Sequence, residues 1–148
     1  MRNVIGVLAG VLLLAAAGCG KSESEKAREA AGRGPITCEE TATSKATGLP
    51  AGFPQPDAVT YVKAAQNGPT VIVNGFSTDD LDATFDAYKS GFESAGFTVK
   101  GTDHEEDDAE IEYAAKDGSG GQVALRAGES CDNGNTSVYV TNRPGEQD

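Results

Sequence analysis

Residues 78–97 read TDDLDATFDAYKSGFESAGF, and this stretch decides the fold. Its apolar side chains recur four, three, four and three residues apart, which predicts one stripe on an α-helix. The stripe consists of Leu81, Phe85, Tyr88, Phe92 and Ala95. Such a helix is stable only when another element covers its apolar side, so the rest of the domain has to supply a flat apolar surface.

Both ends of this helix carry capping signals. Ser77 or Thr78 is predicted to accept hydrogen bonds from the first N–H groups, and the aspartates that follow favour the positive end of the helix dipole. At the other end, Gly96 is suited to a left-handed conformation, and Phe97 is expected to contact Phe92.

Runs of β-branched and aromatic residues on either side of the helix predict strands. We expect these strands at 58–64, 70–76, 97–101, 109–115, 122–127 and 136–141. Asn67 and Gly68 favour a tight hairpin, but Pro69 has no N–H and predicts a longer loop there. The order β-β-α-β-β-β predicts an α+β domain, in which an antiparallel sheet of about five to six strands packs on one main helix.

A second hairpin is predicted to turn over residues 117–121, which read DGSGG. This turn would place Tyr113 opposite Leu125 and Glu112 opposite Arg126. Apolar side chains would then share one face of the hairpin, and a charge pair would lie on the other.

The N-terminus has the pattern of an export signal. Arg2 is followed by a mostly apolar run over residues 4–17, which is shorter than the ~20 residues that a spanning helix needs. The run leads through small residues to Cys19. Residues 1–18 are therefore predicted to be a signal peptide.

Ala16, Ala17, Gly18 and Cys19 resemble the lipobox of bacterial lipoproteins, although the commonest form has leucine at the position of Ala16. The resemblance implies that the Cys19 thiol is lipidated and that the chain is cleaved before it. Acyl chains would then anchor the protein at the extracytoplasmic face of the cell membrane. The chain as a whole looks like the small lipoproteins of unknown role in high-GC Gram-positive bacteria. An ordinary secretory signal with an incidental Cys19 is the alternative.

The mature chain divides into a tether and a domain. Residues 19–35 contain the lipidated Cys19 and no large apolar side chain, which predicts a flexible tether ahead of a single extracytoplasmic domain over 36–148 with a polar tail. Two cysteines remain, and in an exported protein they predict a disulfide between Cys38 and Cys131. Two thiols in an active site or metal site are the alternative.

The formal net charge of −11 argues against a surface that binds nucleic acid non-specifically. The densest acidic run, residues 103–108, reads DHEEDD and offers Asp103, Glu105 and Asp107 as candidate ligands for Ca²⁺. The run lacks the Asp-x-Asp-x-Asp-Gly spacing of a calcium loop, so we interpret it as a solvated loop between two strands.

Catalytic patterns are sparse. His104 is the one histidine, and it would need Cys131 as a nucleophile to form a catalytic pair. Asp82 and Asp86 lie four residues apart, but off the apolar stripe, which predicts a solvated face. Ser119 lacks the Gly-x-Ser-x-Gly pattern of a nucleophile elbow. The sequence therefore predicts neither an enzyme nor a cofactor.

These observations predict a membrane-anchored bacterial lipoprotein that acts as a non-catalytic binding or accessory module of the cell envelope. Its expected partners are the lipid bilayer, through acylated Cys19, and an envelope protein or a small cationic ligand. The alternative is a calcium-responsive module or a hydrolase that uses residues 103–108.

Overall fold

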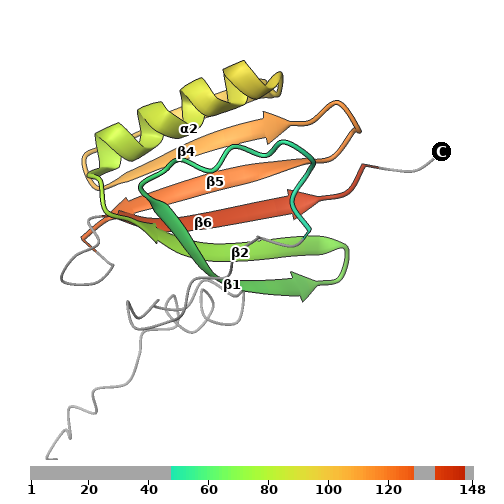
Figure 1. The fold of residues 1–148 in the computed structure, drawn as a ribbon, viewed down its shortest axis with the longest axis horizontal. Coiled ribbons are helices and arrows are strands. Elements are labelled where there is room, and N and C mark those ends of the chain that lie inside the picture. Colours follow the sequence, from blue (N-terminus) through green and yellow to red (C-terminus); the bar gives the residue numbers. More distant parts are fainter. Residues whose placement is uncertain (1–47, 129–135, 146–148) are drawn as a thin grey trace, which may run out of the picture.

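The computed structural model describes residues 48–128 and 136–145 (Figure 1). The signal peptide, Cys19, the tether, Cys38 and Cys131 lie outside these residues, so what the sequence predicts for them stays a prediction. Within the two described ranges, no helix has both the length and the apolar character needed to cross a membrane.

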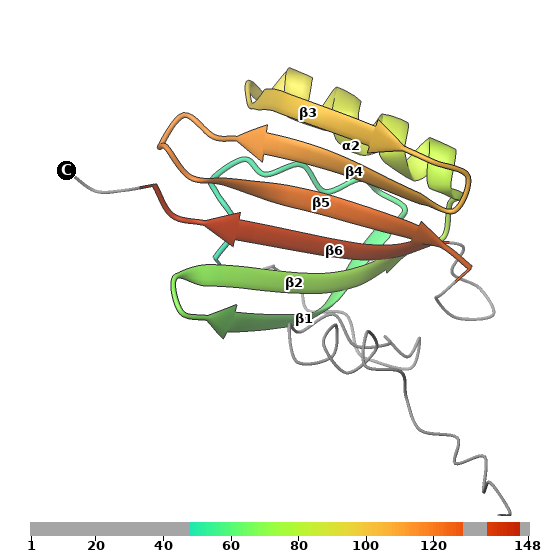
Figure 2. The same cartoon turned by 180° about the vertical axis from the view of Figure 1, so that it is seen from behind.

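The domain is a six-stranded antiparallel sheet with one helix packed on it, which confirms the predicted α+β class. The sheet order is β1-β2-β6-β5-β4-β3, so the last strand lies in the middle of the sheet and β1 and β3 form its edges (Figure 2). The elements are β1 (Val59–Asn67), β2 (Thr70–Ser77), α2 (Leu81–Ala95), β3 (Thr98–His104), β4 (Asp108–Ala114), β5 (Gly120–Ala127) and β6 (Thr136–Arg143).

The core lies between α2 and the sheet and is centred on Phe92, which is fully buried. Its ring stacks on Tyr113 at a centroid distance of 4.9 Å and meets the edge of Phe53 at 5.3 Å. Phe53 belongs to the segment before β1, which crosses the sheet beside the helix (Figure 1). The ring of Phe97 lies 5.5 Å from that of Phe92, so the predicted contact between them is confirmed.

The helix begins later than predicted, and the expected cap at Ser77 or Thr78 is wrong. Asp80 is the N-cap, and its Oδ1 accepts a hydrogen bond from Ala83 N at 2.9 Å. Ser77 instead ends β2, where its buried hydroxyl accepts a 2.8 Å bond from Thr84 Oγ1. Ser77 therefore connects β2 to the helix through its side chain and does not cap the helix.

The C-terminal end of α2 follows the prediction. Gly96 has a φ of 76°, and the N–H of Phe97 donates to the carbonyl oxygen of Phe92 at 2.9 Å. This is the Schellman arrangement expected from a glycine at this position. The predicted stripe is wrong at Ala95, which is exposed, and Phe85 is only half-buried.

The β1–β2 hairpin is tighter than predicted. Asn67 pairs directly with Thr70, which leaves only Gly68 and Pro69 in the turn. The N–H groups that close a two-residue turn belong to the flanking residues, so the missing N–H of Pro69 costs nothing. Gly68, with a φ of 57°, supplies the positive φ that such a turn requires.

The register of the β4–β5 hairpin differs from the prediction. Tyr113 lies opposite Gly121, not opposite Leu125. The predicted pairing of Glu112 with Arg126 is also wrong, because the turn comes earlier in the chain and Gly121 belongs to β5. The displacement is an even number of residues, so the apolar side chains still point to the face that carries the helix.

The turn of this hairpin is held by Asp117 and Ser119. Asp117 Oδ1 accepts hydrogen bonds from Ser119 Oγ at 2.6 Å and from Ser119 N at 2.9 Å. Both bonds favour the ionised carboxylate, and the bond from the hydroxyl is the main cause that lowers the pKa of Asp117 below its usual value of 3.8.

Replacing Ser119 with alanine is expected to raise the pKa of Asp117, because the hydroxyl donor is lost. A lowered pKa stabilises the folded hairpin above the pKa of the unfolded chain, and this contribution disappears as the pH falls through the lowered pKa. The measurement is an NMR titration of the Asp117 carboxyl carbon in the original protein and in Ser119→Ala. An identical pKa in both proteins would show that the hydroxyl has no such role.

Candidate functional site

The sheet has two different faces. One carries α2, and the other, here called the open face, carries no helix or strand of the described residues (Figure 2). Successive side chains of a strand point to opposite faces, so the open face can be assigned from the residues between the core positions. On β4 the core positions are Ala109, Ile111 and Tyr113, which leaves Glu110 and Glu112 on the open face.

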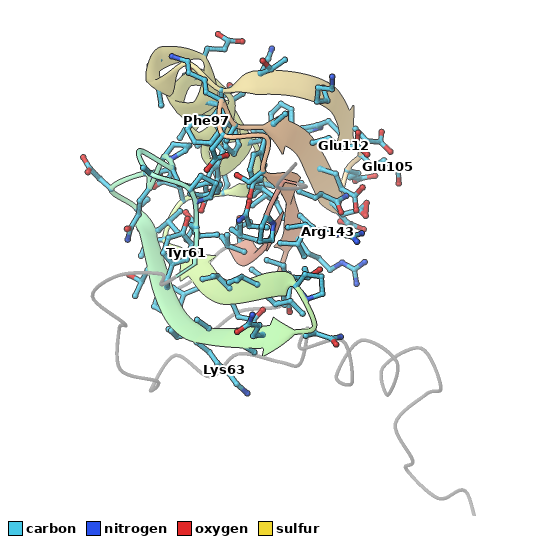
Figure 3. The ribbon with its side chains drawn as sticks, turned by 90° about the vertical axis from the view of Figure 1, so that its right-hand side faces the viewer. Tyr61, Lys63, Phe97, Glu105, Glu112 and Arg143 are labelled. Atoms are coloured by element: carbon cyan, nitrogen blue, oxygen red, sulfur yellow. The ribbon has the colours of Figure 1, made fainter. Side chains whose placement is uncertain are left out.

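Carboxylates gather where the open face reaches β3 and β4. Asp103 of β3 lies directly opposite Glu110 of β4, and Glu112 follows two residues along the same face. Asp108 takes the corresponding position before Glu110. We call Asp103, Asp108, Glu110 and Glu112 the acidic row. Figure 3 shows Glu112 and Glu105 on the side of the sheet away from Tyr61 and Phe97.

A shallow depression of about 300 Å³ lies within the acidic row. Its lining consists of Gly101, Thr102, Asp103, Glu110 and Glu112. Gly101 is the partner of Glu112 in the register, and a side chain there would begin 3.5 Å from Glu112 Oε2. The glycine therefore leaves the space beside this carboxylate open.

The acidic row is suited to binding positive charge. Like charges that lie opposite each other destabilise a sheet, and a bound ammonium or guanidinium group removes this repulsion. Carboxylates also form short, strong hydrogen bonds with such groups. Within residues 48–128 and 136–145, no three His, Cys, Asp or Glu side chains are grouped so that they could hold a metal ion.

The acidic run at 103–108 is not the six-residue loop that the sequence suggests. Asp103 and His104 belong to β3 and Asp108 to β4, which leaves only residues 105–107 in the turn. Glu105 N donates to the carbonyl oxygen of Asp108 at 2.8 Å and closes the turn. Strand alternation then divides the run between the two faces of the sheet, so Asp103 joins the acidic row and His104 does not.

His104 lies against the helix. Its Nε2 is 3.1 Å from Asp82 Oδ1, and its ring meets the edge of Phe85 at a centroid distance of 4.8 Å. Asp82 is 82% exposed and Asp86 is exposed as well, which agrees with the solvated face predicted for them. The pair that the sequence allows between His104 and Cys131 lies partly outside the described residues.

The buried hydroxyl groups have structural partners that sequence reasoning missed. Tyr61 OH and Tyr88 OH are 2.8 Å apart in the core, and Tyr113 OH donates to the carbonyl oxygen of Thr141 at 2.9 Å. Burial raises the pKa of Tyr61 to about 12 and raises the pKa values of Tyr88 and Tyr113 as well. These phenols stay neutral at physiological pH and hold the strands to each other and to the helix. The sequence places Tyr88 on the helix stripe and Tyr113 on the apolar face of its hairpin, but it does not indicate these hydrogen-bond partners.

Comparison with known proteins adds no relative: no family model, curated protein or solved structure matches this chain.

Proposed function

We propose that the protein is a lipid-anchored bacterial lipoprotein whose domain is a non-catalytic binding module of the cell envelope, and that its acidic row binds a cationic partner. The observation that carries the binding proposal is the alignment of Asp103, Glu110 and Glu112 around one depression of the open face. The anchoring proposal comes from the lipobox-like residues before Cys19.

The open face is a better candidate for binding than the edges of the sheet. Both edge strands contain a bulge, at Tyr61/Lys63 in β1 and at Val99/Gly101 in β3. Exposed lysines lie at both places, Lys63 and Lys100. Bulges and edge lysines discourage the addition of another strand. We therefore place the partner on the sheet face and not along β1 or β3.

The binding proposal is tested with a short oligolysine peptide as the cationic probe, in calorimetric titrations at low salt. The double variant Glu110→Gln/Glu112→Gln is expected to bind the probe about tenfold more weakly, since two lost ion pairs at about 0.7 kcal/mol each together amount to about 1.4 kcal/mol. The matched control is Asp86→Asn/Glu93→Gln, which removes the same charge from exposed positions on the helix. Equal weakening in both variants, or no binding by the original protein, would contradict a site at the acidic row.

The anchoring proposal is tested by expressing the full chain in a bacterial host. The mature protein is expected in the membrane fraction, with an intact mass that lacks residues 1–18 and includes acyl groups on Cys19. Cys19→Ser is expected to leave the membrane fraction, because acyl chains supply ~0.8 kcal/mol for each buried CH₂. A Cys19→Ser protein that stays with the membrane would rule out this anchor.

The proposed disulfide between Cys38 and Cys131 is tested with the same preparation. A disulfide lowers the intact mass by two hydrogens, and a digest without reductant then contains the two cysteine peptides joined. Free thiols at both positions in protein taken from the envelope would rule it out.

The alternative that the sequence leaves open is a calcium-responsive module or a hydrolase that uses residues 103–108. No three carboxylates of this run are grouped for a metal ion in the described residues, so a calcium titration is the direct test. Ca²⁺ at 100 times its Kd would stabilise the fold by ~2.7 kcal/mol. A melting temperature that does not change in millimolar Ca²⁺ counts against the calcium module. Loss of a measurable hydrolytic activity in His104→Ala would favour the enzyme.

A further inference from the structure

Charge is distributed unevenly along the strand direction of the domain. α2 begins, and β3 turns into β4, at the same end of the sheet, here called the acidic end. The described carboxylates at this end are those of Asp57, Asp79, Asp80, Asp82, Asp103, Glu105, Glu106, Asp107 and Asp108. Among the described lysines and arginines, the register places Arg126 at this end, opposite Asp108. The acidic end therefore has a large net negative charge.

Counted over the residues that the structure describes, the opposite end of the sheet is close to neutral. Here α2 ends, and the β1–β2 and β4–β5 turns and the C-terminus of β6 lie together. Its basic residues are Lys100, Lys116 and Arg143, and its acidic residues are Glu93, Glu112 and Asp117. The ammonium group of Lys116 lies beside Gly96, just past the negative end of the helix dipole.

The described chain enters the domain at this neutral end. Asn142 Nδ2 donates to the carbonyl oxygen of Gly48 at 3.1 Å, and Gly48 lies against Val71. Asn142 is near the end of β6, and Val71 is near the start of β2. We call this the tethered end, because the chain that leads back to Cys19 joins it.

The two ends are far enough apart to experience different potentials at a membrane. Strands of eight residues at about 3.3 Å per residue are about 25 Å long. The screening length at physiological ionic strength is about 8 Å. A surface of anionic lipid headgroups therefore repels the acidic end when that end is the closer one, and has little effect on an end whose charges balance.

We propose that the anchored domain stands with its tethered end toward the anionic headgroups and its acidic end away from them. This inference rests on the proposed anchoring through Cys19. The proposed disulfide would fix Cys38 to Cys131, which follows in the sequence where β5 ends at the acidic end, so the free part of the tether is then residues 20–37. These 18 residues can extend about 60 Å, more than the length of the strands, so either end of the domain can still reach the bilayer. Charge, and not the length of the tether, selects the orientation. The consequence is that the acidic end, which includes Asp103 and Asp108 of the acidic row, is directed to the envelope, where a cationic partner can reach it.

The orientation is measured on the full lipidated protein in nanodiscs of phosphatidylglycerol and phosphatidylcholine that contain some lipid with a gadolinium-chelating headgroup. The metal relaxes nearby amide protons, so NMR compares the turn at 116–118 of the tethered end with the turn at 105–107 of the acidic end. The relaxation rate that the gadolinium adds to the amide protons is expected to be several-fold larger at 116–118 than at 105–107. Nanodiscs of phosphatidylcholine alone, or ~1 M salt, are expected to remove most of this difference, because the screening length falls to about 3 Å.

Two variants with equal charge changes separate this effect from a fixed contact with the membrane. Glu105→Gln/Glu106→Gln, in the exposed turn of the acidic end, is expected to reduce the difference between the two turns. Glu93→Gln/Glu112→Gln, at the tethered end, is expected to keep or increase it. Equal enhancement at both turns in the original protein, or a difference that neither salt nor the first variant changes, overturns the orientation but leaves the anchor intact. Protein that fails to remain in the nanodisc overturns the anchoring and this inference together.

Discussion

Phe92→Ala is expected to lower the free energy of unfolding by about 3–5 kcal/mol, the range for removing a fully buried phenylalanine. Phe92 has no exposed surface, and rings from three other parts of the fold contact it. Phe53 comes from the segment before β1, Phe97 from the connection between α2 and β3, and Tyr113 from β4. The substitution therefore leaves a cavity at the point where the helix, the sheet and the crossing segment meet.

Such a loss is a large part of the 5–15 kcal/mol that stabilises a typical domain. The measurement is chemical denaturation of Phe92→Ala and the original protein under the same redox conditions. Phe85→Ala is the control, because Phe85 lies on the same helix but is only half-buried and should cost about 1–2 kcal/mol. A loss below about 1 kcal/mol for Phe92→Ala would contradict a core centred on this ring.

Gly121→Ala is expected to destabilise the domain by about 3 kcal/mol or to prevent folding. A Cβ at Gly121 would collide with the backbone carbonyl oxygen of Thr141 on β6, and a backbone atom inside a sheet has little room to move. Gly121 also lies opposite Tyr113, so any shift of β5 disturbs a strand on each side. Circular dichroism and denaturation of the variant measure the effect.

Gly101→Ala is the matched control in the edge strand β3. A Cβ at Gly101 would lie 3.5 Å from Glu112 Oε2, an ordinary contact with a flexible side chain. We expect a change within about 0.5 kcal/mol, the usual range for an exposed substitution. If Gly121→Ala were tolerated as well as Gly101→Ala, the close packing of β5 against β6 would be wrong.

Only part of the acidic row can be predicted from the local sequence pattern. The alternation of Glu110 and Glu112 with buried neighbours predicts that both point to one face. Asp103 belongs to the same surface only because β3 continues to His104 and pairs with β4. The sequence suggests a solvated loop there, since six consecutive polar residues resemble a connection more than two strand ends. Cross-strand pairing overrode this local signal and produced the candidate site.

By itself the sequence determined the class of the fold, the existence of the helix, its glycine-based ending and the apolar face of the hairpin at 109–115 and 122–127. These features depend on interactions between residues close in the chain, or on periodicities that any buried face imposes. Only the tertiary structure decided that β6 lies between β2 and β5, that Asp80 caps the helix, and that Gly121 sets the hairpin register. Each of these depends on contacts between distant segments, as when Ser77 bonds Thr84 or β5 packs against the backbone of Thr141. The energies of such contacts are as large as the helix and strand propensities of the residues, and the neighbouring sequence does not indicate which contacts will form.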